Sequence, residues 1–178
     1  INLFLPQSDQ AADDLPATYI ARLGYKGKKR KVLVVDNEAV DRELIINILE
    51  PLGFEMAEAS TGQECLDIYP TFKPDLILMD LAMPVMDGWE ASYIIRKIYQ
   101  SDTVIGIVSA NAYDQNLENS AGIDASDFIV KPVSVEALLD WIGNKLVLEW
   151  VGNELVVADY KETVHTHHVD DVAALEEK

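Results

Sequence analysis

Short apolar runs alternate with amphipathic stretches along most of this chain. Five of the runs have the length and composition of short strands, namely residues 31–35, 54–59, 76–79, 104–108 and 127–130. Between them, apolar residues recur at helical spacing. Strict alternation of strand and helix predicts a parallel sheet with helices on both faces.

Five helices are predicted to follow the five strands. The apolar face of the first consists of Val40, Leu44, Ile45, Ile48 and Leu49. Ser60 and Gln63 form a Ser-x-x-Gln capping box that opens the second. The others are placed at residues 89–99, 112–121 and 135–147. The whole pattern indicates an α/β fold of the flavodoxin-like type, a doubly wound five-stranded parallel sheet with five helices.

Polar side chains stand where four of these strands end. Asp36 and Asn37 follow the first strand, Asp80 follows the third, Ser109 the fourth and Lys131 the fifth. The carboxyl ends of parallel strands share one edge of the sheet, and open α/β sheets place their sites there. Asp80 ends the most apolar run and is therefore the candidate for the reacting group.

These residues stand in four ordered elements: Val-Val-Asp-Asn-Glu, Leu-Met-Asp-Leu-Ala-Met-Pro-Val-Met-Asp-Gly, Val-Ser-Ala and Val-Lys-Pro. Together they are far more specific than any single motif. Over residues 31–147 the chain resembles the receiver domain of two-component response regulators. The resemblance implies that Asp80 accepts a phosphoryl group from phosphohistidine.

The resemblance also implies a Mg²⁺ ion beside the phosphoacceptor. Its ligands would be Asp36, Asn37, Asp80 and the backbone carbonyl of Ala82. The departure is Asn37, because the family usually has a second acid there. An amide oxygen binds Mg²⁺ without supplying charge, so we expect weaker affinity for the ion.

Three further residues take roles from the resemblance. Lys131 would pair with Asp80 at rest and with the phosphoryl group afterwards, through a backbone fixed by a cis bond to Pro132. Ser109 would donate its hydroxyl to the phosphoryl group, and Phe128 would be the aromatic residue that moves with the Ser109 loop.

Asp87-Gly88 is interpreted as turn chemistry, with Gly88 supplying a positive φ.

The segments on either side of residues 31–147 are harder to interpret. Residues 1–30 are expected to be a leader and linker, and residues 1–6 resemble the last strand of a histidine-kinase ATP-binding domain, with a loosely docked leader as the alternative. Residues 148–178 are expected to hold a β-hairpin at 148–157 and the start of a helix at 169–178. The resemblance thus favours a receiver from a hybrid sensor histidine kinase.

Composition narrows the setting. The chain carries a net charge of −17, most of it within residues 32–145, which argues against nucleic-acid binding. The basic segment 26–31 is interpreted as a solvated flank, with anion binding as a minor alternative. No apolar stretch reaches the length of a membrane helix, and the single Cys65 suits a reducing compartment. We therefore expect a cytoplasmic domain without direct membrane contact, although its parent kinase could be membrane-anchored.

The expected partners are a phosphohistidine-bearing kinase dimerisation domain or a histidine phosphotransfer protein. The sequence leaves homodimerisation, the input signal and the enzymatic status of the chain open. Asn37 motivates an alternative, a pseudo-receiver that binds partners without phosphorylation. A phosphohydrolase of the haloacid dehalogenase type needs Asp-x-Asp after the first strand, which Asp36-Asn37-Glu38 does not provide. Flavin binding would need a phosphate-cradling loop after the first strand, and the sequence has none there. The cluster His165, His167 and His168 is interpreted as solvated.

Overall fold

The computed structural model describes residues 18–111, 114 and 119–156. The chain divides into two compact units, one formed by Ala21–Asn153 and the other by Ile1–Ile20 with Glu154–Lys178. All the site residues predicted above belong to the first unit. The predicted strand at 1–6, the predicted helix at 169–178 and the histidine cluster lie outside the described residues.

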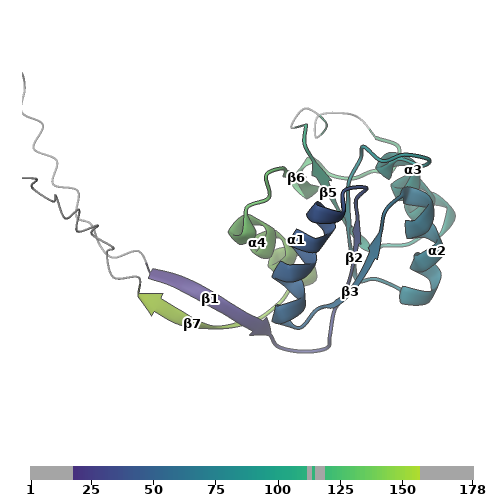
Figure 1. The fold of residues 1–178 in the computed structure, drawn as a ribbon. Coiled ribbons are helices and arrows are strands. Elements are labelled where there is room, and N and C mark those ends of the chain that lie inside the picture. Colours follow the sequence, from purple (N-terminus) through teal and green to yellow (C-terminus); the bar gives the residue numbers. More distant parts are fainter. Residues whose placement is uncertain (1–17, 112–113, 115–118, 157–178) are drawn as a thin grey trace, which may run out of the picture. The chain divides into compact units, whose positions relative to one another are not determined.

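The sheet of the first unit is parallel and has the strand order β3-β2-β4-β5-β6 (Figure 1). Its strands are β2 (Lys31–Val35), β3 (Glu55–Ala59), β4 (Leu76–Met79), β5 (Val104–Ser109) and β6 (Phe128–Val130). All five coincide closely with the predicted runs. The order is that of a flavodoxin-like doubly wound sheet, so the predicted fold class is confirmed.

Four α-helices occur in the described residues: α1 (Ala39–Leu49), α2 (Gly62–Phe72), α3 (Gly88–Tyr93) and α4 (Val135–Leu146). A π-helical turn, Ile94–Ile98, continues α3 and completes the helix predicted at 89–99. The helix predicted at 112–121 falls mostly outside the described residues. None of the helices described is long and apolar enough to cross a membrane.

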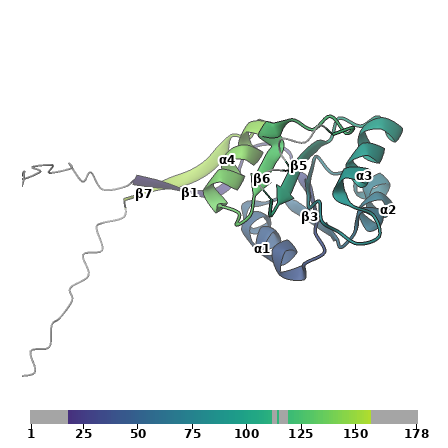
Figure 2. The same cartoon turned by 90° about the horizontal axis from the view of Figure 1, so that it is seen from above.

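Helices α1 and α4 cover one face of the sheet, and α2 and α3 cover the other (Figures 1 and 2). Strand β2 shows how one sequence serves both faces. Leu33 and Val35 pack into the cluster with α2 and α3, whereas Val32 and Val34 pack into the cluster with α1 and α4. A strand that is buried on both faces has a continuous apolar sequence, which is why this strand could be predicted.

The predicted apolar face of α1 is partly wrong. Ile45 and Leu49 are buried as expected, but Val40 is 75% exposed and Leu44 is exposed as well. Successive residues on a helix are 100° apart, so stripes through Leu44 and through Ile45 do not both face the sheet. The sheet takes the stripe through Ile45.

The capping box of α2 lies one residue further along than predicted. Thr61, and not Ser60, is the N-cap, and its hydroxyl accepts from the backbone N–H of Glu64 at 3.1 Å. The Glu64 carboxylate in turn accepts from the backbone N–H of Ser60 at 2.7 Å. Either Ser60 or Thr61 satisfies the sequence rule, and the paired glutamate selects the second.

The flanking segments differ from the sequence expectation. Residues 18–25 fall mostly within the predicted linker, yet they form strand β1 (Thr18–Tyr25). Its partner is β7 (Trp150–Val156), one continuous strand where a hairpin was predicted. The ring of Tyr25 lies 4.6 Å from that of Phe54 and 6.2 Å from that of Trp150. A partner more than 120 positions away explains why the local pattern suggested a linker for the first segment and a self-paired hairpin for the second.

Candidate functional site

Asp80 follows β4 and lies at the carboxyl edge of the sheet, as predicted. Its backbone N–H donates to the carbonyl of Val35 at 2.8 Å, which ties the end of β4 to the end of β2. The residue is only 5% exposed, and its Oδ2 accepts from the backbone N–H of Ala82 at 2.9 Å. Burial raises the pKa of Asp80 and the nearby charge of Asp36 raises it further, against the opposing effect of Lys131.

Asp36 follows β2 and lies beside Asp80 at the same edge. The residue is 2% exposed, and its Oδ1 accepts from the backbone N–H of Glu38 at 2.9 Å. Asn37, in contrast, is exposed, and its side-chain amide donates to Glu38 Oε1 at 3.0 Å. The structure therefore brings the two predicted carboxylates together and leaves the side chain of Asn37 at the rim.

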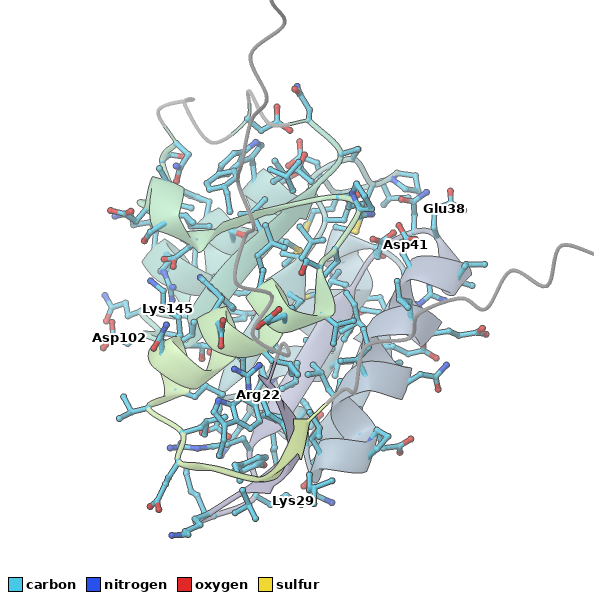
Figure 3. All side chains as sticks on the ribbon, turned by 90° about the vertical axis from the view of Figure 1, so that its left-hand side faces the viewer. Arg22, Lys29, Glu38, Asp41, Asp102 and Lys145 are labelled. Carbon is cyan, nitrogen blue, oxygen red and sulfur yellow. The ribbon has the colours of Figure 1, made fainter. Side chains whose placement is uncertain are left out.

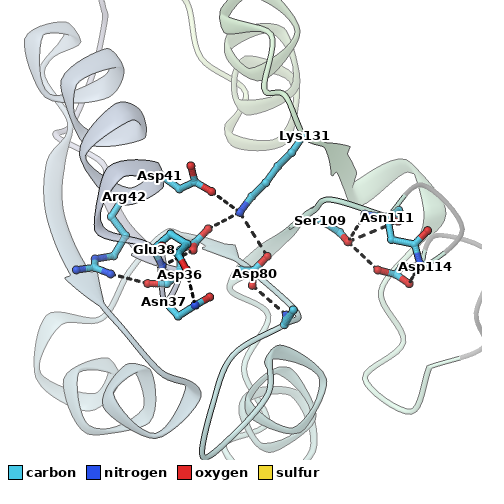
Figure 4. Close-up of polar contacts among 11 residues, drawn as sticks. Asp36, Asn37, Glu38, Asp41, Arg42, Asp80, Ser109, Asn111, Asp114 and Lys131 are labelled. Atoms are coloured by element: carbon cyan, nitrogen blue, oxygen red, sulfur yellow. Dashed lines mark hydrogen bonds and ion pairs between the residues drawn. The ribbon is translucent and has the colours of Figure 1, made fainter.

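Lys131 joins these carboxylates from β6 (Figure 4). Its Nζ lies 2.7 Å from Asp36 Oδ2, 2.6 Å from Asp41 Oδ2 and 3.5 Å from Asp80 Oδ1. The expected ion pair with Asp80 is present, but the two shorter contacts go to the other acids. Burial lowers the pKa of Lys131, and the hydrogen bonds to Asp36 and Asp41 outweigh that effect and raise it. The backbone N–H of Lys131 donates to the carbonyl of Ser109 at 2.9 Å, and the bond to Pro132 is cis, as expected.

Ser109, at the end of β5, is buried and faces a different acid. Its hydroxyl donates to Asp114 Oδ2 at 2.6 Å and accepts from the backbone N–H of Asn111 at 3.0 Å. Phe128 is half-buried, and its ring lies 5.8 Å from that of Trp89. The serine hydroxyl is thus engaged on its own loop.

The loop between Asp80 and α3 differs from the sequence expectation. Gly88 is not among the described glycines that have a positive φ, so the prediction that it supplies one is wrong. A Cβ there would lie 2.1 Å from the carbonyl oxygen of Asp80, so Gly88 is needed for close approach of two backbones. The positive φ of this loop, 70°, belongs to Val85, which is 89% exposed.

The residues expected to hold Mg²⁺ fit a hard cation. Asp36 and Asp80 are buried carboxylates, and both share the single ammonium of Lys131 with Asp41. Within the part of the chain that is described, no three His, Cys, Asp or Glu side chains form a metal cage. Two carboxylates with neutral oxygens suit Mg²⁺, which keeps several of its waters.

The basic segment at residues 26–31 is largely neutralised by ion pairs. Lys28 and Arg30 each approach Asp75 Oδ1 at 3.1 Å, and the backbone N–H of Lys31 donates to Asp75 Oδ2 at 3.0 Å. Burial raises the pKa of Asp75, but these hydrogen bonds outweigh it and lower the pKa. Residues 26–30 precede β2 and Lys31 begins it, so this segment lies at the opposite end of the strand from Asp36.

Comparison with known proteins decides the family. The family model described as response regulator receiver domain matches residues 32–143. The chain belongs to the response regulator receiver domain family. This receiver domain is 36% identical over 119 residues to the chemotaxis protein CheY of Bacillus subtilis, an alignment that covers 65% of this chain and 97% of CheY. The receiver fold also matches the chemotaxis response regulator CheY4 of Vibrio cholerae, with a TM-score of 0.60 and 28% identity, over 66% of this chain and 99% of that one.

Other relatives are longer than the matched region. The probable transcriptional regulator ycf27 of Porphyridium aerugineum is 33% identical over 111 residues, which cover 62% of this chain and 45% of that protein. The chain therefore spans less than half the length of such relatives. The shared part is the receiver domain, which serves two-component signalling.

Sequence reasoning missed two acids that contact the candidate site residues Lys131 and Ser109. Asp41, in the first turn of α1, binds Lys131, and Asp114 binds Ser109. A signal for Asp41 was present, because a helix that starts at the active edge directs its first turn there. Asp114 gave no such signal, since its position depends on a loop.

Proposed function

We propose that this receiver domain accepts a phosphoryl group on Asp80 from a phosphohistidine. The observation that carries the proposal is a buried carboxylate at the sheet edge with a second carboxylate and a single ammonium beside it. That arrangement has a net negative charge at the place where an incoming phosphoryl group requires positive charge. It suits a site completed by a divalent cation.

Phosphoryl transfer requires little covalent work from the protein. A carboxylate oxygen of Asp80 forms the new P–O bond while the bond between phosphorus and the histidine nitrogen breaks, and the electron pair returns to the imidazole. Two negative groups about 4 Å apart repel by about 4 kcal/mol at an effective dielectric of 20. Mg²⁺, when bound by Asp36, Asn37, Asp80 and the carbonyl of Ala82, supplies the charge that offsets this repulsion.

The same geometry provides a switch after transfer. The phosphoryl oxygens attract the Lys131 ammonium and the Ser109 hydroxyl, both of which now bind other acids. Ser109 must leave Asp114, which moves its loop toward Asp80. Phe128, half-buried in the neighbouring strand, then changes its packing as that loop moves.

The domain assignment and partners follow from this activity. Residues 31–147 would form the receiver, with residues 1–30 and 148–178 as flanking segments of a hybrid sensor histidine kinase that acts in the cytoplasm. The phosphoryl donor would be the dimerisation domain of that kinase or a histidine phosphotransfer protein. In such a relay Asp80 serves as both acceptor and donor.

One observation favours a second candidate, a pseudo-receiver that binds partners without phosphorylation. Asn37 carries no charge, so a bound ion would lack one charged ligand of the usual set. Its side chain is also exposed and donates to Glu38. Asp80, Ser109 and Lys131 all remain in place, which favours the first candidate.

The test is the intact mass of the chain after incubation with acetyl phosphate, with and without Mg²⁺. An adduct of one phosphoryl group that requires Mg²⁺ and is lost in Asp80→Asn is the expected result. Folded protein that gains no adduct under any condition would instead support the pseudo-receiver.

A further inference from the structure

Asp41 contacts the active-site lysine although it belongs to none of the four sequence elements of the receiver. It lies in the first turn of α1, at the end of that helix where Glu38 also lies (Figure 3). Its Oδ2 is 2.6 Å from Lys131 Nζ, the shortest of the three carboxylate contacts of that ammonium (Figure 4). The Asp41 side chain is 38% exposed, so it is within reach of solvent and yet fixed on the lysine.

The lysine is consequently directed away from the phosphoacceptor. Its two contacts of hydrogen-bond length go to Asp36 and Asp41, on the β2 and α1 side, whereas Asp80 Oδ1 is 3.5 Å away. Charge-assisted hydrogen bonds between an ammonium and an oxyanion are about 2.7–2.9 Å long. To reach a phosphoryl oxygen on Asp80, Nζ has to redirect at least one of its short hydrogen bonds.

Asp41 is the bond that is easier to give up. Asp36 is buried, and removing its ammonium partner would leave an uncompensated charge out of contact with water. The carboxylate of Asp41 can be rehydrated when the lysine leaves, because it is partly exposed. Arg42, the neighbouring cation on α1, already binds Glu58 and the carbonyl of Asp36.

We propose that Asp41 is a positioning residue that holds Lys131 in its resting place and competes with the phosphoryl group for that ammonium. This inference rests on the proposed phosphoacceptor function of Asp80. Removing the Asp41 charge weakens one hydrogen bond of Lys131, so the phosphoryl group competes for that ammonium against a weaker acceptor. The resting site then needs less reorganisation to bind its anion.

The test uses beryllofluoride, a non-covalent mimic of the phosphoryl group, titrated into the full chain at saturating Mg²⁺ and followed by ¹⁹F NMR. We expect Asp41→Asn to bind beryllofluoride three- to tenfold more tightly than the wild type. Asp41→Glu retains the carboxylate and should restore wild-type affinity. Glu43→Gln removes the same charge from an exposed position on α1 and is the matched control, with no change expected.

The outcomes separate this inference from the function on which it rests. Urea unfolding of each variant first establishes that it is folded, and Mg²⁺ affinity is measured separately for each. If the wild type binds beryllofluoride and Asp41→Asn binds it equally or more weakly, the role of Asp41 is overturned and the proposed function is not. An equal gain in Glu43→Gln would reassign the effect to general electrostatics and also overturn it. A wild-type chain that takes neither beryllofluoride nor phosphate would refute the proposed function itself.

Discussion

Replacing Gly88 with alanine tests whether the backbone of α3 fixes the position of Asp80. Gly88 opens α3, and its N–H donates to the carbonyl of Leu81 at 3.2 Å. An alanine Cβ would lie 2.1 Å from the carbonyl oxygen of Asp80 and 3.0 Å from its carbonyl carbon. Both neighbours are backbone atoms, so no rotamer change relieves the overlap.

The magnitude follows from the size of that overlap. Ordinary contact would need the two backbones to separate by about 1 Å, and overpacking of this kind costs about 1–3 kcal/mol. Rigid backbone on both sides places Gly88→Ala at the upper end, and better helix propensity returns up to about 1 kcal/mol. We expect a net loss of about 2 kcal/mol in the free energy of unfolding, or about 4–8 °C in Tm.

Two assays on the same variant check the reasoning. Urea unfolding followed by circular dichroism measures the stability, and the rate of Mg²⁺-dependent phosphorylation by acetyl phosphate measures the position of Asp80. A displacement of 1 Å at a reacting group can cost about 100-fold, so we expect at least a tenfold slower rate. Gly24→Ala, whose Cβ would meet the carbonyl of Leu52 at an ordinary 3.4 Å, is the control. A Gly88→Ala protein with wild-type stability and rate would refute the close approach.

The remaining predictions concern charge, backbone strain and the packing of Trp150 in β7. The pKa of Asp80 is raised, so its ionisation costs folding free energy as pH rises above its unfolded pKa; Asp80→Asn should exceed the wild type in urea midpoint at pH 7 and match it near pH 3. The pKa of Asp75 is lowered, so this carboxylate stabilises the folded state above its unfolded pKa, and that stabilisation is lost as pH falls through its folded pKa. Asp75→Asn should therefore lower the free energy of unfolding by about 1–2 kcal/mol at pH 7 and by much less in acid. Val85→Gly removes a β-branched residue from a φ of 70° and should raise Tm by a few degrees, about 0.5–1 kcal/mol, in a thermal melt. Gly143→Ala would place a Cβ 2.5 Å from the indole nitrogen of Trp150, so its fluorescence should red-shift as the ring is displaced.

The sequence predicted the centre of the sheet well because strands β2, β4 and β5 are buried on both faces. Such strands appear as uninterrupted apolar runs, and the polar residue that ends each run marks the active edge, which located Asp36, Asp80 and Ser109. The face of α1 was harder, because the same residues fit two stripes 100° apart. Which stripe is buried depends on the sheet beneath it and not on the helix itself.

Interactions between distant segments account for most of what the sequence did not predict. Strand β1 has mixed composition, and only its pairing with β7 and the packing of Tyr25 against Trp150 make it a strand. Gly88 shows the same limit at short range. Its place after Asp87 suggested a turn. In the structure, the missing side chain of Gly88 instead lets α3 approach the backbone of Asp80.

The distribution of charge explains why the proposed phosphorylation would need a cation. Lys28 and Arg30 pair with Asp75 at the edge where β2 begins, so they do not serve the edge where β2 ends. At that active edge, the ammonium of Lys131 faces three carboxylates in the described residues. A phosphoryl group brings further negative charge, and one ammonium shared among three acids does not balance it. The proposed phosphorylation of Asp80 would therefore require both a divalent cation and the release of Lys131 from at least one acid. The partly exposed Asp41 is the acid that the lysine would leave most readily.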